Sequence, residues 1–162
     1  MRVFRGKVFS LRKEIDKAGY RTYMAMKTVD KVVDGRLTYE TVQIVPSLLF
    51  VRCDLAWLKT FKSSHLGELM VYNDKPGTPA AIDDEEMKMF IFVTSAGGQV
   101  ECVSSACDLT RGDRVRVTDG IYKGTEGVIK RIKKDRKLLV AVNGVAIVAI
   151  SQIPQEYLEK IN

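Results

Sequence analysis

The feature that most constrains the fold is a glycine-spaced segment at residues 110–132, TRGDRVRVTDGIYKGTEGVIKRI. Gly120, Gly124 and Gly127 fall within eight residues of one another. Such a density of glycine is incompatible with a stable helix, but it lets the backbone adopt positive φ and bend sharply between short strands. The Asp119-Gly120 pair marks a turn at the start of this glycine cluster.

Strand patterns flank the glycines on both sides. Val115 and Val117 alternate with charged or polar neighbours, which is the period of a strand with one buried face. A second strand begins at Val128 and continues to Ile132. Sharp bends between short strands predict a small, tightly curled β-barrel.

The remaining C-terminal residues extend this barrel. Residues 137–142 and 145–150 are rich in β-branched and aliphatic residues and are predicted to pair through Asn143-Gly144, a typical hairpin turn. Residues 133–136 form a charged hairpin tip, and residues 151–158 are expected to close the chain.

The first two thirds of the chain have a different pattern. Val8, Leu11 and Ile15 recur at helical spacing, and Gly19 stands where a helix would end. Asp34-Gly35 then signals a hairpin between two extended segments, residues 20–33 and residues 37–51. The second segment is expected to be interrupted by a bend or bulge at Pro46, because proline cannot donate to a strand ladder.

Two further helices have clear starting signals. Asp54 is a predicted N-cap for a helix that ends near residues 63–64, and Asp83 with Glu86 predicts a capping box for a helix that ends near residue 95. Residues 73–79 are expected to form a loop. The predicted fold class is therefore α+β, with an antiparallel sheet and flanking helices followed by a small barrel, and predicted bounds of 1–97, 98–109 (a short linker) and 110–162.

The charge distribution favours an anionic partner. The chain has a formal net charge of +6, and its first 31 residues carry nine Lys or Arg against three acidic residues. Residues 130–137 carry six basic residues against Asp135. Both basic patches are also compatible with solvated surfaces that keep a protein soluble.

Other classes of protein are disfavoured. The longest apolar run is interrupted by Asn143-Gly144 and the N-terminus lacks an apolar signal, so a cytoplasmic protein without membrane contact is expected. Cys53, Cys102 and Cys107 contain no CxxC pair, so neither a disulfide framework nor a metal site is indicated.

An enzyme is not expected either. His65 is the only histidine and has no nucleophile pattern around it. The glycines at 120–127 lack the Gly-Lys-Ser/Thr ending of a phosphate loop and precede a strand. The acidic residues 83–86 are explained by the start of a helix. The sequence thus predicts no cofactor and no small-molecule substrate.

The C-terminal pattern resembles the KOW motif of NusG-type transcription elongation factors, which also occurs in ribosomal proteins. The matching residues are Gly112, Asp113, Val115, Val117, Gly120, Tyr122, Gly124, Gly127, Val128 and Ile132. The resemblance implies a small SH3-like barrel that acts on nucleoprotein machinery.

The N-terminal part resembles the NGN domain of the same family. Residues 46–51, PSLLFV, are similar to the family's Pro-x-Tyr-hydrophobic-Phe-Val strand, and Arg5-Gly6-Lys7 matches the entry to its first helix. The Trp-Tyr that commonly opens the first strand is missing, and Leu48 replaces the usual Tyr. These departures and the compact connection look more like the specialised bacterial paralogues of the UpxY and RfaH kind, which serve long operons such as those for surface polysaccharides.

The resemblance implies an antitermination or elongation factor that binds the clamp helices of RNA polymerase and suppresses pausing. The implied polymerase-binding residues are Phe4, Val45, Leu48 and Phe50, although strand alternation also allows each to be core. Arg5, Lys7, Arg12 and Lys13 are implied contacts to non-template DNA. Tyr122, Asn143, Gly144 and Val145 are implied contacts of the barrel with a ribosomal protein or the Rho termination factor, and Tyr122 is equally compatible with barrel core. The alternative is a ribosome- or RNA-binding KOW protein that uses residues 130–137.

Overall fold

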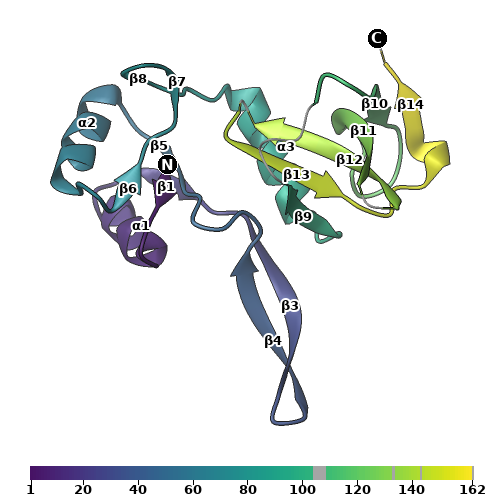
Figure 1. Ribbon diagram of the computed structural model, residues 1–162, viewed down its shortest axis with the longest axis horizontal. Helices are drawn as coiled ribbons and strands as arrows, with labels where there is room; N and C mark the ends of the chain where they lie inside the picture. The colour runs from purple at the N-terminus through teal and green to yellow at the C-terminus, as the bar shows by residue number, and fades with distance from the viewer. Residues whose placement is uncertain (104–108, 133, 143, 162) are drawn as a thin grey trace. The chain divides into compact units, whose positions relative to one another are not determined.

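A computed structural model describes residues 1–103, 109–132, 134–142 and 144–161 (Figure 1). The described part is a mixed α/β protein with three α-helices, and its paired strands are antiparallel. Its contacts divide the chain into two compact units. One unit comprises Met1–Met24 and Val45–Ala81, and the other comprises Ala25–Ile44 and Ile82–Asn162.

The first unit combines two short strand pairs with two helices. β1 (Arg2–Val3) pairs with β6 (Leu69–Met70), and β2 (Arg21–Tyr23) pairs with β5 (Phe50–Arg52). The helices are α1 (Val8–Lys17) and α2 (Leu55–Ser64). The core is formed by apolar side chains from β1, β5 and β6, from the two residues before β5, and from the helices: Val3, Val8, Leu11, Ile15, Leu48, Leu49, Phe50, Phe61 and Leu69.

Local signals explain why these helices form and where they end. The apolar stripe of α1 is buried at Val8, Leu11 and Ile15, and Gly19 follows the helix with a φ of +87°. The Asp54 side chain accepts a hydrogen bond of 2.8 Å from the Trp57 backbone N–H and thereby caps α2. These predictions are confirmed.

Two segments differ from the strand predictions. The strand expected across residues 37–51, with an interruption at Pro46, is divided in two: β4 (Arg36–Gln43) ends before Pro46-Ser47, where Ser47 has a φ of 64°, and β5 begins at Phe50. Residues 73–79, expected as a loop, contain β7 (Asn73–Lys75) paired with β8 (Thr78–Pro79). Gly77, with a φ of 78°, allows the tight turn between them.

The second unit contains a long hairpin and a third helix. β3 (Met26–Val33) and β4 (Arg36–Gln43) pair over their whole lengths, and Asp34 and Gly35 form the turn, as the sequence predicts. α3 (Asp84–Ser95) is capped by Asp83, whose side chain accepts a 2.8 Å hydrogen bond from the Glu85 N–H. α3 packs against strand β12 (Asp135–Val142), which belongs to the six-stranded sheet described next.

The region predicted to be a small barrel is one six-stranded antiparallel sheet in the order β14-β10-β11-β12-β13-β9, which we call the barrel sheet. Its strands are β9 (Val100–Val103), β10 (Asp113–Val117), β11 (Glu126–Ile132), β12 (Asp135–Val142), β13 (Ala146–Ile150) and β14 (Leu158–Lys160), and the 3₁₀-helix η1 (Gln155–Tyr157) precedes the last strand. All five residues of β13 are buried. The strands predicted around the glycines are therefore present.

Strand β9 lies inside residues 98–109, which the sequence places in a linker. Val100–Val103 pairs with β13, so this part of the segment belongs to the sheet. The segment is poor in strand signals, and its pairing with distant residues is what fixes its structure. The domain bounds 1–97, 98–109 and 110–162 otherwise stay a prediction.

Candidate interaction surfaces

The four residues implied in polymerase binding differ in exposure. Leu48 and Phe50 are 3% and 7% exposed, so their side chains belong to the core of the first unit. The bridge between Leu48 and Arg2 and the pairing of Phe50 with Tyr23 bring both residues into paired backbone. Val45 is half-buried, and Phe4 is 38% exposed. Phe4 and Val45 are therefore the accessible members of the set.

A second accessible apolar side chain lies close to Phe4. The Phe4 N–H donates to the Glu68 carbonyl at 2.7 Å, so Phe4 continues the antiparallel pairing of β1 with β6. Opposite residues of such a pair share a face, and so do residues two apart on one strand. Phe4 lies opposite Glu68, two residues before Met70, so Phe4 and Met70 are on one face while Val3 and Leu69 are buried on the other. Met70 is 41% exposed. We call the surface of Phe4 and Met70 the β1–β6 face.

The sequence did not single out Met70. The alternation of Leu69 and Met70 could have indicated an outward residue, but the strand is short and its partner is distant in the sequence. The sequence alone does not show that β1 pairs with β6, so it does not predict that Met70 and Phe4 lie on the same face.

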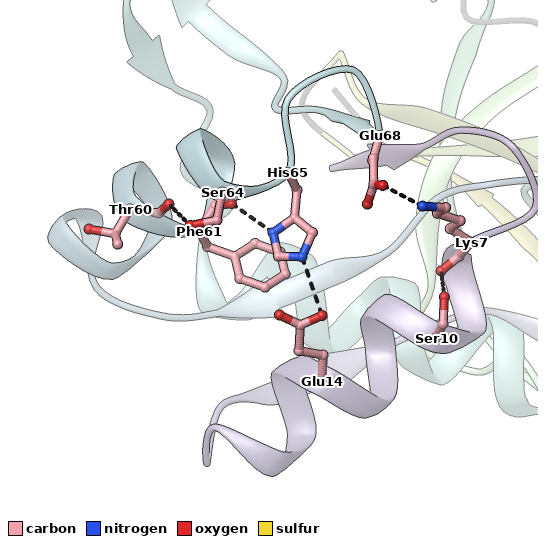
Figure 2. Close-up of polar contacts among 8 residues, drawn as sticks. All are labelled: Lys7, Ser10, Glu14, Thr60, Phe61, Ser64, His65 and Glu68. Carbon is pink, nitrogen blue, oxygen red and sulfur yellow. Dashed lines mark hydrogen bonds and ion pairs between the residues drawn. The ribbon is translucent and has the colours of Figure 1, made fainter.

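Polar contacts fix the elements beside this face (Figure 2). The Lys7 Nζ forms an ion pair with Glu68, which lowers the pKa of that carboxyl. Both ring nitrogens of His65 face acceptor oxygens, with Nδ1 2.9 Å from the Phe61 carbonyl oxygen and Nε2 3.2 Å from the Glu14 carboxylate (Figure 2). Its ring lies 4.2 Å from the Phe61 ring. His65 thus links α1 to the end of α2.

The four residues implied in DNA binding all lie in the first unit, and their side chains reach its surface. Arg5 is exposed, with a φ of 55°, and Lys13 is exposed on α1. Lys7 is paired with Glu68, and the Arg12 Nε lies 3.6 Å from Asp16. Exposed ion pairs are weak, so these pairings leave the side chains able to exchange partners with a phosphate.

The implied partner contacts of the barrel divide in a similar way. Tyr122 is 5% exposed, and burial raises the pKa of its hydroxyl. A methyl group on Gly98 would sit 2.1 Å from the Tyr122 Oη, so the ring is packed tightly. Val145 is 8% exposed and Gly144 is exposed, while Asn143 lies outside the described residues. Tyr122 and Val145 therefore act mainly as core.

The basic tip predicted from residues 130–137 is formed by the ends of β11 and β12. Arg131 lies directly opposite Arg136, and both are exposed. Lys130 lies opposite Lys137, which is ion-paired with Glu101. Like charges at opposite positions destabilise a strand pair, so a bound anion would reduce the repulsion between Arg131 and Arg136.

A groove of about 240 Å³ lies along the barrel sheet and the C-terminal segment. Its lining combines apolar side chains, including Val115, Leu138 and Leu158, with the charged residues Asp113, Arg136 and Lys160. The Lys160 Nζ and Asp113 form an ion pair of 2.6 Å. The lining of the groove is therefore amphipathic.

Comparison with known proteins identifies a KOW motif at residues 111–145. The match begins just before β10 and ends after the turn between β12 and β13, so it covers the glycine-bent part of the six-stranded sheet. It is consistent with a NusG-like or other KOW-containing protein. No curated protein matches the chain.

Within the described ranges, no three His, Cys, Asp or Glu side chains gather closely enough to hold a metal ion. None of the helices in those ranges is long and apolar enough to cross a membrane. Cys53 is half-buried with a raised thiol pKa, chiefly because of burial, whereas Cys107 lies outside the described residues.

Proposed function

We propose that the protein is a non-enzymatic transcription elongation or antitermination factor of the NusG type. The observation that carries the proposal is the KOW motif at residues 111–145 in a glycine-bent sheet, in a chain that also contains an α+β unit of Met1–Met24 and Val45–Ala81. The likeness of that unit to an NGN domain, a cytoplasmic location, and a role in specific bacterial operons such as surface polysaccharide clusters are part of the proposal.

The first unit offers the contact to RNA polymerase. Phe4 and Met70 provide an exposed apolar surface on paired strands. Such a surface suits the tip of a helical hairpin, whose apolar side chains would become buried against it. The clamp helices of RNA polymerase are therefore the proposed partner. The protein bound to them would suppress pausing by the polymerase.

The basic N-terminal residues support the same role. Arg5, Lys7, Arg12 and Lys13 would contact the backbone of the non-template strand, adding affinity that is sensitive to salt and independent of sequence. The barrel would recruit a ribosomal protein or Rho. Its exposed turn at Gly144 and the amphipathic groove at Leu138 and Arg136 are the surfaces available for that contact.

The test is an elongation assay with purified core polymerase. The protein should bind the core enzyme and shorten pauses, and Phe4→Ser combined with Met70→Ser should weaken both effects by roughly tenfold or more. Phe9→Ser is the matched control, since Phe9 is a similarly exposed aromatic residue (51%) but lies on α1. Absence of binding to core polymerase at low salt would overturn the proposal.

A second candidate is an RNA-binding or ribosome-binding KOW protein. The like-charged Arg131–Arg136 pair favours it, because a phosphate backbone would relieve the repulsion. Co-sedimentation with ribosomal subunits in the absence of transcription, lost in Arg131→Ser with Arg136→Ser, would select this candidate. Retained co-sedimentation in that variant would exclude the tip as the contact.

A further inference from the structure

The β3–β4 hairpin is a two-stranded ribbon with an exposed distal half. Within the described residues its strands pair only with each other, from Met26↔Gln43 at the base to Val33↔Arg36 at the turn (Figure 1). Asp34 and Gly35 both have positive φ, 51° and 74°, as a two-residue hairpin turn requires. The base is anchored where β3 packs against α3 and the Lys27 Nζ donates to the Val100 carbonyl at 3.3 Å.

Three large side chains gather on one face of the distal half. Residues opposite each other in the ladder share a face, and Val32 pairs with Leu37 while Asp30 pairs with Tyr39. Val32, Leu37 and Tyr39 therefore lie together, and they are 69%, 59% and 71% exposed. We call these three residues the hairpin patch.

The opposite face has a different character. Lys31 and Glu40 lie there and form an ion pair of 2.8 Å, beside half-buried Val29 and the 44% exposed Val33. The hairpin patch lies on the other face, where the exposed Asp30 is opposite Tyr39, so that face carries three of the four large exposed apolar side chains of the hairpin. An isolated two-stranded hairpin is only marginally stable in water, and it gains nothing from exposing its apolar side chains. The hairpin patch therefore indicates a surface that becomes buried on binding.

Charge argues for a protein occupant. Residues 26–43 carry three basic side chains and three acidic ones, so the hairpin is neutral in a chain of net charge +6. Nucleic-acid contacts are made by basic side chains, and the hairpin patch contains none. Aromatic and aliphatic anchors surrounded by polar residues are typical of protein interfaces.

Size argues against a second copy of the chain. The four distal residue pairs form a ribbon about 10 Å wide and about 13 Å long, or on the order of 130 Å² for one face. A stable interface buries about 800 Å² on each partner. A narrow ribbon buries its apolar side chains most completely when it enters a groove in a larger protein.

We propose that the hairpin patch enters an apolar groove on RNA polymerase and forms a second contact, distinct from the β1–β6 face. This inference rests on the proposed function. Two linked contacts on the same partner strengthen each other, because the second forms within the complex already made by the first. Removal of the hairpin contact is expected to weaken binding to core polymerase roughly 10- to 100-fold.

The experiment measures the affinity of the full chain for core polymerase by fluorescence anisotropy. The test variant is Leu37→Ser with Tyr39→Ser, and a second variant joins Thr28 to Thr41 through Asn-Gly so that the distal hairpin is removed. The matched control is Lys31→Ser with Glu40→Ser, which changes the polar face and leaves the net charge unaltered. Circular dichroism and thermal unfolding check that each variant is folded.

Weaker binding by both hairpin variants, with the control unchanged, supports the inference. If the wild type binds and the hairpin variants bind equally well, the inference is overturned and the proposed function stands. If the wild type does not bind, the inference and the proposed function are both overturned. Equal weakening in the control would show that the hairpin patch is not the contact. Sedimentation velocity that showed a wild-type dimer and monomeric hairpin variants would assign the patch to a second copy instead.

Discussion

Gly127 sets how closely two strands of the barrel sheet approach. A Cβ at this position would lie 2.3 Å from the Leu139 carbonyl oxygen and 2.9 Å from the Leu138 Cδ1. The first neighbour is the backbone of the paired strand β12, which cannot move without disturbing the ladder. Gly127 therefore serves packing as well as the bend that the sequence suggests.

Replacing Gly127 with alanine should destabilise the protein by about 1–3 kcal/mol, the usual cost of overpacking. Urea unfolding of the two proteins measures the difference. Glu126→Ala is the control, because it alters the neighbouring residue of β11 without adding an atom between the strands. Equal stability of Gly127→Ala and the wild type would show that the strands can separate locally.

The Asp54 carboxyl group is expected to make the stability of the protein depend on pH. The Trp57 N–H, followed by the 2.9 Å hydrogen bond from the Tyr20 hydroxyl, lowers the pKa of Asp54 below its ordinary value of 3.8. A lowered pKa in the folded state means that the carboxylate stabilises the fold above pH 3.8, and that this contribution is lost as the pH falls through the folded-state pKa.

Thermal unfolding from pH 7 to pH 2 measures this contribution. The wild type should lose more of its unfolding temperature below pH 4 than Asp54→Asn, which keeps an N-cap but has no charge to titrate. Tyr20→Phe should fall between them, since it removes the smaller of the two causes. Parallel curves for the wild type and Asp54→Asn would contradict the assignment.

The elements that the sequence predicts well are those whose signals are local. α1, α2 and α3 follow from apolar spacing and from caps at Asp54 and Asp83, and the β3–β4 hairpin follows from Asp34-Gly35. β9 was missed because it is held by pairing with β13 rather than by its own composition. Long-range pairing is the information that a local pattern lacks.

The same limit applies to the candidate surfaces. Alternation along a strand separates two faces, but only tertiary packing determines which face is covered. Leu48 and Phe50 were expected as possible docking residues and are buried, whereas Met70 joins Phe4 on the exposed face. Charged residues on α1 were easier to place, because Leu11 and Ile15 fix the buried side of that helix.

At the scale of one hairpin, the β11–β12 tip offers a test of its own electrostatics. Arg131→Glu would replace the like-charged pair with Arg136 by an opposite pair, which should raise stability by about 0.2–1 kcal/mol at low salt. The gain should largely disappear at about 1 M NaCl, because screening is then strong. Urea unfolding at both salt concentrations measures it.

Lys134→Glu is the control for the tip, since it makes the same charge change in the turn rather than within a cross-strand pair. If both variants gain equally, the effect comes from the overall charge of the protein. If neither gains, the arginines avoid each other by pointing apart, and the argument for a bound anion loses its physical basis.

At the scale of the whole molecule, the contacts divide the chain differently from its sequence patterns. The barrel sheet includes β9, and α3 packs against β12 of the same sheet. Leu139, Ile147 and Ala149 form a buried cluster against which Val103 of β9 packs. A fragment with the sequence-based bounds 110–162 would lack both β9 and α3.

The three fragments 110–162, 98–162 and 82–162 test which bounds form a stable barrel. In the shortest one, β13 becomes an edge strand with five apolar or small residues that are buried in the full chain, and its edge hydrogen bonds lose their partner. It should unfold at the lowest urea concentration and associate at micromolar concentrations, as size-exclusion chromatography would detect. Restoring β9 should remove most of the association, and restoring α3 should add stability by covering β12. Equal stability and a monomeric state for all three would instead show that residues 110–162 form the complete barrel, with β9 and α3 as additions to it.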